Sequence, residues 1–337
     1  MKEKLSEIER FNFRNIHPQI SLGTASDRYG GWIGQIYSEG RYQITRRSKK
    51  IAEKVFLEEV LPVESVSEYF EHFSVLEIDF TFYRPLLDSA LKPTPSYYVL
   101  RKYKTYLGEN DGLILKVPQI ISARKLQIGG KYTANPNFLN PQRFVDQFYN
   151  PALTLLGRSL KGFIFEQEYH VKNERVPADE NVRHLDAFFD NIPADNRYHI
   201  ELRTGAYLTR SYFQLLEKHG VGQIFSHWTW LPPLSKQFQK SSQRFFNRSG
   251  NVIIRLMTPP RKGYGDTYAD AFPFDQMVEG MLNPQMVEEA AELMANAVRQ
   301  GVHANTIINN RSGGNAPMIA QLVAGRFNEK QTGNTHE

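Results

Sequence analysis

Charged and apolar side chains alternate along the segment Val75 to Pro85. Because successive side chains of an extended strand point to opposite faces, one face should carry Glu77, Asp79, Thr81 and Tyr83, and the other Leu76, Ile78, Phe80 and Phe82. The apolar face would pack on outer helices and the acidic face would point inward. Buried carboxylates need cations, a metal or hydrogen-bond donors, so this segment predicts a polar site.

Cations that could meet these carboxylates occur in other apolar segments. The same alternation places Glu201 and Arg203 on one face of the segment 198–203, and Lys116 and Arg255 are single charges within apolar runs. Two interpretations fit these residues equally well: a catalytic site, or an ion network that only neutralises buried charge.

A polar turn follows the apolar run that ends at Ile308. It contains Asn309, Asn310, Arg311 and the pair Gly313-Gly314 just before a predicted helix. Backbone N–H groups at such a turn can bind an anion or a phosphate, although a simple helix cap explains the same residues. Trp228 and Trp230 lie beside prolines and could stack on a planar ligand or close the end of the fold.

These residues suggest a pocket in which acid/base groups act on a small anionic substrate. The candidate catalytic residues are Glu77, Asp79, Glu201 and Arg203. The candidate substrate-binding residues are Tyr83, Lys116, Gln167, Trp228, Arg255, Asn309 and Asn310. No metal ligands are assigned; if a metal takes part, clustered carboxylates favour Mg²⁺ or Mn²⁺.

Several kinds of chemistry are excluded or unsupported. The chain has no cysteine, so disulfides, thiolate nucleophiles and cysteine-ligated metals are excluded. The nucleotide-binding motifs GxGxxG and GxxxxGK[ST] are absent, so no nucleotide cofactor is expected. The serine hydrolase motif GxSxG and the zinc-binding motif HExxH are absent as well. His170 and His227 follow apolar runs without a metal-binding spacing.

Eight short apolar runs recur along the chain, and segments with helical periodicity separate them. The runs cover residues 19–23, 75–80, 113–117, 162–166, 198–202, 221–225, 251–256 and 305–308. This alternation predicts an α/β fold, a single (β/α)8 TIM barrel with extended loops on its C-terminal face. An open α/β sheet is the alternative.

The connecting segments contain helix signals and three long loops. Helices are expected over 49–60, 96–107 and 284–298, the last after Asn283 and Pro284. The long loops are 24–48, 126–141 and 258–284, and such loops usually carry function. We expect an N-terminal extension over 1–18, the barrel over 19–328 and a polar C-terminal tail over 329–337.

The net charge of +5 gives a second function some support. Basic side chains in the loops (Arg46, Arg47, Lys49, Lys50, Arg261 and Lys262) could bind nucleic acid without catalysis. The N-terminus lacks an apolar stretch and no run is long enough to span a membrane, so a cytoplasmic location is expected and no membrane partner. The sequence does not indicate an oligomeric state.

The chain resembles the DUF72 (YecE-like) family of uncharacterised TIM-barrel proteins. The resemblance runs from about Ile20 to Phe327 and rests on Leu22-Gly23-Thr24, 32–37, 76–84, 115–118, 200–203, 254–256 and Asn309-Asn310. It implies the barrel fold and no established reaction. Three departures affect the pocket: Asp79 stands where the family commonly has Asn, Met257 and Thr258 replace a histidine and a glycine, and only Gln167 remains of a Gln-Phe-Pro-Pro segment.

Overall fold

A computed structural model describes residues 2–51, 53–260 and 262–333. Eight parallel strands form a closed barrel in the order β1-β12-β11-β10-β9-β8-β5-β4. They are β1 (Ile20–Ala25), β4 (Val75–Ile78), β5 (Gly112–Lys116), β8 (Leu160–Gln167), β9 (Tyr198–Leu202), β10 (Gly222–His227), β11 (Asn251–Leu256) and β12 (His303–Ile308). Each predicted apolar run corresponds to one strand, which confirms the (β/α)8 barrel and rules out the open sheet.

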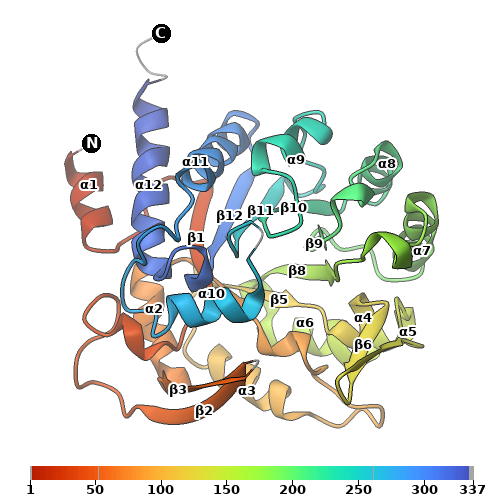
Figure 1. Ribbon diagram of the computed structural model, residues 1–337, viewed down its shortest axis with the longest axis horizontal. Helices are drawn as coiled ribbons and strands as arrows, with labels where there is room; N and C mark the ends of the chain where they lie inside the picture. The colour runs from red at the N-terminus through yellow and green to blue at the C-terminus, as the bar shows by residue number, and fades with distance from the viewer. Residues whose placement is uncertain (1, 52, 261, 334–337) are drawn as a thin grey trace.

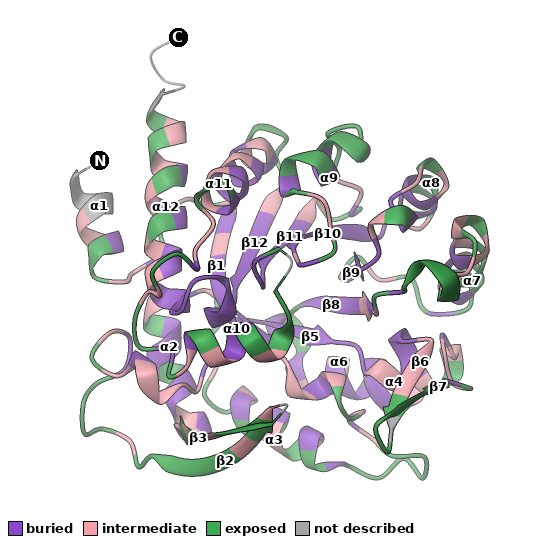
Figure 2. Cartoon of the chain, viewed as in Figure 1, coloured by how far each residue is buried: buried purple, intermediate pink, exposed green. Residues whose placement is uncertain are grey.

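Helices surround the barrel and cover the outer faces of the strands (Figure 1). They are α1 (Lys2–Glu9), α2 (Val66–His72), α3 (Pro95–Lys104), α4 (Gln119–Ser122), α5 (Pro141–Phe144), α6 (Asn150–Leu156), α7 (Ala178–Asp190), α8 (Arg210–His219), α9 (Leu234–Lys240), α10 (Tyr264–Ala271), α11 (Pro284–Arg299) and α12 (Ala316–Gly333). Asn283 caps α11 by accepting a hydrogen bond from the Gln285 N–H, as its sequence signal predicts. Figure 2 shows the barrel strands buried and the helices exposed on their outer sides.

The inside of the barrel is divided into an apolar layer and a polar layer. Strands β4, β5, β8, β10, β11 and β12 each contribute one branched apolar side chain to a buried cluster: Val75, Ile114, Ile164, Ile224, Ile253 and Ile307. Two residues further along, the inward positions carry Glu77, Lys116, Glu166 and Arg255. The polar layer therefore lies at the carboxyl ends of the strands, where barrel enzymes place their active sites.

The segment 49–60 is not a helix, contrary to the prediction. Strands β2 (Thr45–Ile51) and β3 (Lys54–Val60) pair in an antiparallel ribbon, which lies beside α10 (Figure 1). Its apolar residues Ile51 and Phe56 pack against a small cluster that includes Tyr268 and Phe274. A second ribbon of β6 (Lys125–Ile128) and β7 (Lys131–Ala134) occupies much of the loop expected over 126–141.

The two ends of the chain are partly helical. In the N-terminal segment, Ile8, Phe13 and Ile16 are buried, and α1 packs against α12. Helix α12 continues to Gly333, so residues 329–333, expected within a polar tail, belong to a helix, while 334–337 lie outside the described residues. Among the described residues, no helix has the length and apolar character needed to cross a membrane.

Candidate functional site

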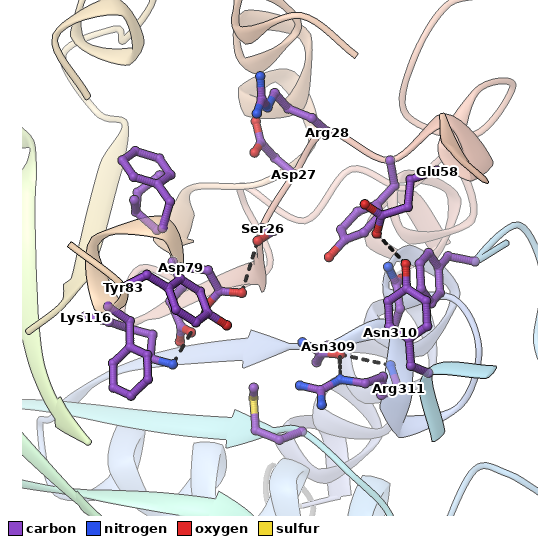
Figure 3. A pocket seen from close by; sticks show the side chains of 18 of the residues that line it. Ser26, Asp27, Arg28, Glu58, Asp79, Tyr83, Lys116, Asn309, Asn310 and Arg311 are labelled. Carbon is purple, nitrogen blue, oxygen red and sulfur yellow. Dashed lines mark hydrogen bonds and ion pairs between the residues drawn. The ribbon is translucent and has the colours of Figure 1, made fainter. Parts of the chain in front are cut away.

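A cavity of about 450 Å³ opens at the carboxyl end of the barrel (Figure 3). Strand ends form its floor, and the β2–β3 ribbon and α10 contribute to its walls. Eight of the eleven residues expected in the site line it: Glu77, Asp79, Tyr83, Lys116, Arg203, Trp228, Asn309 and Asn310. The sequence therefore placed most of its candidates correctly, although other residues also line the cavity.

Arg255 is the centre of an ion network beneath the cavity. Its side chain is completely buried, and its Nε and Nη2 atoms donate to the two oxygens of Glu77 over 2.8 and 2.6 Å. Its Nη1 atom donates to Glu201 and, over 3.3 Å, to Glu166. Because Arg255 meets three carboxylates and has no exposure, it holds strand ends together and is not free to bind a substrate.

Arg203 and Lys116 extend this network toward the cavity. Arg203 donates from Nη2 to Glu166 over 2.7 Å and from Nε to Glu201 over 3.2 Å. The Lys116 ammonium lies 2.8 Å from Glu166 and 4.0 Å from Asp79. Burial opposes charge on Lys116, but Glu166 and Asp79 outweigh it and raise the pKa of Lys116 above its ordinary value.

The acidic members of the network differ in how well their charge is compensated. Burial opposes ionisation of Glu166, yet Arg203 and Lys116 hold its pKa well below the usual range. Burial raises the pKa of Glu77 to about 7, with Arg255 acting in the opposite direction. The network thus combines three cations with Glu77, Glu166 and Glu201, and leaves little net charge in the barrel.

Asp79 is the carboxylate that remains accessible. Its side chain is 38% exposed, and Ser26 Oγ donates to its Oδ2 over 3.2 Å. Strand β4 ends at Ile78, and a 3₁₀ turn, η3 (Phe80–Phe82), follows Asp79. The alternation predicted to continue to Tyr83 therefore stops: Thr81 is buried and donates to the Lys116 carbonyl over 2.8 Å, and Tyr83 lies on the rim with 70% exposure.

Gln167 is placed differently from the prediction. Its Oε1 accepts a hydrogen bond from Asn181 of α7 over 3.1 Å, and it does not line the cavity. The inward position belongs to its neighbour Glu166, because Gly162 and Ile164 set the phase of β8. The alternation of this strand would have identified Glu166 in the sequence.

Two further residues of the cavity were not among the candidates. Asp27 follows β1 and is buried; its Oδ1 accepts from Tyr103 OH over 2.7 Å. Burial raises the pKa of Asp27 to about 6, and Arg28 opposes the shift. Arg311 follows β12 and stacks over Tyr264, with 4.2 Å between the guanidinium carbon and the ring centre.

The tryptophans and histidines contribute less than their positions suggested. Trp228 lies against Arg203, with 3.8 Å between the guanidinium carbon and the ring centre, so it supports the network from the cavity side. Trp230 stacks on Tyr169 outside the cavity. His170 and His227 do not line the cavity, and burial lowers the pKa of each to about 4.

Comparison with known proteins agrees with this architecture. Residues 22–337 match DUF72, a family of proteins of unknown function. A DUF72 protein of Enterococcus faecalis is similar in structure, with a TM-score of 0.57, 16% identity and coverage of 92% of this chain and 95% of that one. For a DUF72 protein of Thermotoga maritima the TM-score is 0.56 and the identity 15%, with coverage of 93% and 99%.

At these identities the structural similarity supports the fold alone. No curated protein matches the chain. The family match covers nearly the whole sequence and begins within β1. The chain therefore belongs to the DUF72 family.

Proposed function

We propose that the protein is an enzyme of the hydrolase or isomerase type that acts by acid/base catalysis on a small anionic substrate, phosphorylated or sugar-like, in the cavity at the barrel mouth. One observation carries this proposal. Of the four acidic side chains that the strand ends direct into the barrel, Glu77, Glu166 and Glu201 are bound by cations, and only Asp79 is both exposed and more than 3.5 Å from a cation.

Asp79 is suited to remove a proton from a substrate or from a water molecule. Its two oxygens face the cavity beside Ser26 and Lys116 (Figure 3). Lys116 remains protonated because of Glu166 and can stabilise negative charge that develops on the substrate. Glu77, Glu201 and Arg255 act as positioning residues that fix the strand ends beneath these two side chains.

The proposal is tested with a panel of sugar phosphates incubated in D2O and followed by proton and phosphorus NMR. Isomerisation would introduce deuterium into a substrate, and hydrolysis of a phosphate ester would release inorganic phosphate. We expect the wild type to convert at least one compound, and Asp79→Asn to lower the rate about 10²-fold or more, the typical contribution of a general base.

A positioning role and a catalytic role are separated by stability. Asp79→Asn should change the free energy of unfolding by less than about 0.5 kcal/mol, because its carboxylate is exposed and weakly paired. Arg255→Met should lower it by about 3–5 kcal/mol, because buried Glu77 would lose its partner and buried Glu201 would keep only Arg203 among its described partners. Unchanged turnover in Asp79→Asn, or no turnover of any compound by the wild type, would contradict the proposal.

Binding of nucleic acid receives less support from the basic ribbon. Arg46 pairs with Glu59 and Lys49 with Glu58 on the neighbouring strand, over 3.0 and 2.9 Å. Arg261 lies outside the described residues. The Mg²⁺ or Mn²⁺ considered from the sequence also gains no support, because the carboxylates beneath the cavity already face guanidinium or ammonium groups.

A further inference from the structure

Two buried hydrogen-bond donors at the end of β12 belong to residues that line the cavity, and neither has an acceptor in the described part of the chain. Arg311 Nη1 and Asn310 Nδ2 have no hydrogen-bond partner among the described residues, and both residues line the cavity. Arg311 is 9% exposed and Asn310 is 3% exposed. A buried donor without an acceptor is costly, so two of them beside one cavity indicate an acceptor that arrives with a ligand.

The surrounding contacts hold these donors in place. Both residues belong to the 3₁₀ turn η8 (Asn310–Ser312), and Arg311 Nε donates to Asn309 Oδ1 over 3.1 Å. Asn310 Oδ1 accepts from Trp32 Nε1 over 3.2 Å and from the Ala316 N–H over 2.8 Å, which turns its Nδ2 to the other side. The turn closes at Gly314, whose φ of 111° suits glycine.

The charge of Arg311 is not balanced by the protein. No carboxylate among the described residues lies within 4.0 Å of its guanidinium, whereas Arg203 and Arg255 each have at least two. Burial lowers the pKa of Arg311, although an arginine stays protonated even then. Arg47 of β2 lines the same cavity and likewise lacks a carboxylate within 4.0 Å in the part of the chain that the structure describes. Among the described residues, Arg311 and Arg47 are therefore cavity-lining arginines without a carboxylate partner within this distance.

We infer that Arg311 and Asn310 bind a phosphate group of the substrate. A guanidinium offers a fork of donors that matches phosphate, and Asn310 Nδ2 adds a further donor from the neighbouring residue. A phosphate presents at least three acceptor oxygens and up to two negative charges, so it suits these two donors and the Arg311 charge better than a carboxylate does. Figure 3 shows Arg311 and Asp79 reaching the cavity from different sides, so a phosphate at Arg311 leaves the rest of the substrate facing Asp79. The inference rests on the proposed function for the statement that the ligand is a substrate.

Binding of inorganic phosphate to the full chain tests this site without any assay of activity. Titration calorimetry and thermal unfolding would be carried out at constant ionic strength, with potassium chloride as the reference salt and acetate as a second anion. We expect phosphate to bind and to raise Tm, with acetate at least tenfold weaker. Acetate binding as tightly as phosphate, or no phosphate binding, would overturn the inference.

Three variants locate the binding site. Arg311→Met should weaken phosphate binding at least tenfold without lowering the Tm of the free protein, because removal of a buried charge that no described carboxylate pairs with offsets the lost contacts with Asn309 and Tyr264. Asn310→Asp keeps the Oδ1 acceptor and replaces the free donor with an anionic oxygen, so it should also abolish binding. Arg210→Met, at an exposed arginine on α8 outside the cavity, should bind like the wild type.

Asp79→Asn distinguishes a failure of this inference from a failure of the proposed function. It should bind inorganic phosphate at least as tightly as the wild type, whether or not the protein proves to be an enzyme. Phosphate binding that survives in both Arg311→Met and Asn310→Asp would show that the anion site lies elsewhere.

Discussion

Arg255 contacts three carboxylates that come from three strands. These contacts distinguish residues with a structural role from residues that are free to act on a substrate. Glu77 arrives from β4, Glu166 from β8 and Glu201 from β9. An arginine that makes four hydrogen bonds to carboxylates and is completely buried can fix strand ends but is not accessible to a substrate. The charge-neutralising interpretation therefore applies to the network around Arg255, whereas the proposed catalytic role falls on Asp79, with Lys116 beside it.

Asp27 should make stability depend on pH. Its carboxyl has an ordinary pKa of 3.8, and burial raises the pKa to about 6 in the folded protein. Between these values the folded state keeps a proton that the unfolded state has released, so stability falls as pH rises from about 4 to 6. Over this pH range the free energy of unfolding of Asp27→Asn should fall by about 3 kcal/mol less than that of the wild type, as expected for a pKa shift of about two units.

Urea unfolding of the wild type and of Asp27→Asn at pH 4 and pH 7 measures this effect. The variant retains an oxygen that can accept the hydrogen bond from Tyr103, so the comparison isolates the charge. Glu77 titrates in both proteins, so its contribution to the pH dependence of stability cancels when the two are compared. The assignment fails if the stability difference between the two proteins is the same at both pH values.

Individual side chains were predictable where strand alternation governs them. Glu77, Lys116, Glu201, Arg203 and Arg255 were all expected to point inward, and they do. Alternation failed where strands end: beyond Ile78 the chain turns, so Thr81 and Tyr83 leave the predicted face. Asp27 and Arg311 lie just after strands, where no periodicity applies; the polar turn pointed to Arg311 as part of an anion site, whereas only the folded chain shows that Asp27 lines the cavity.

The β2–β3 ribbon shows why short amphipathic segments mislead. Ile51, Val55 and Phe56 fit a helical stripe, but the same segment pairs as two strands in which Ser48 faces Leu57 and Lys49 faces Phe56. Charged pairs across the strands and the contact of Phe56 with α10 stabilise the ribbon, and the second depends on residues distant in sequence. The core strands were easier to recognise because each one is buried on both faces and therefore forms a short, nearly continuous apolar run.

Phe56→Ala should loosen the ribbon from the barrel. Phe56 packs edge-on against Tyr268 and Phe272, with ring centres 5.0 and 5.2 Å apart. Amide hydrogen exchange over residues 45–60 should become at least tenfold faster, while exchange in β11 and β12 stays unchanged. Leu57→Ala is the matched control, because Leu57 lies on the opposite side of the ribbon with 56% exposure. Equal exchange in the two variants would show that Phe56 does not anchor the ribbon.

The closed barrel could be predicted from the sequence, because few other chain topologies accommodate eight apolar runs separated by helical segments. The role of the N-terminal segment did not follow, since its buried residues are too few to form a pattern. Phe13 packs on Phe73, with ring centres 4.9 Å apart, and Arg14 donates to Asp111 over 2.8 Å. The segment thus joins the region around α2 to α12, which α1 contacts.

Phe13→Ala should therefore destabilise the whole molecule rather than release a tail. Phe13 is completely buried, and the loss of a buried phenylalanine costs about 3–5 kcal/mol. Urea unfolding followed by circular dichroism should show one transition at a lower midpoint, because the segment belongs to the same cooperative unit as the barrel. Arg10→Ala, at an exposed position of the same segment, should stay within about 0.5 kcal/mol of the wild type. An unchanged midpoint in Phe13→Ala would mean that residues 2–17 fold onto a barrel that is already stable without them.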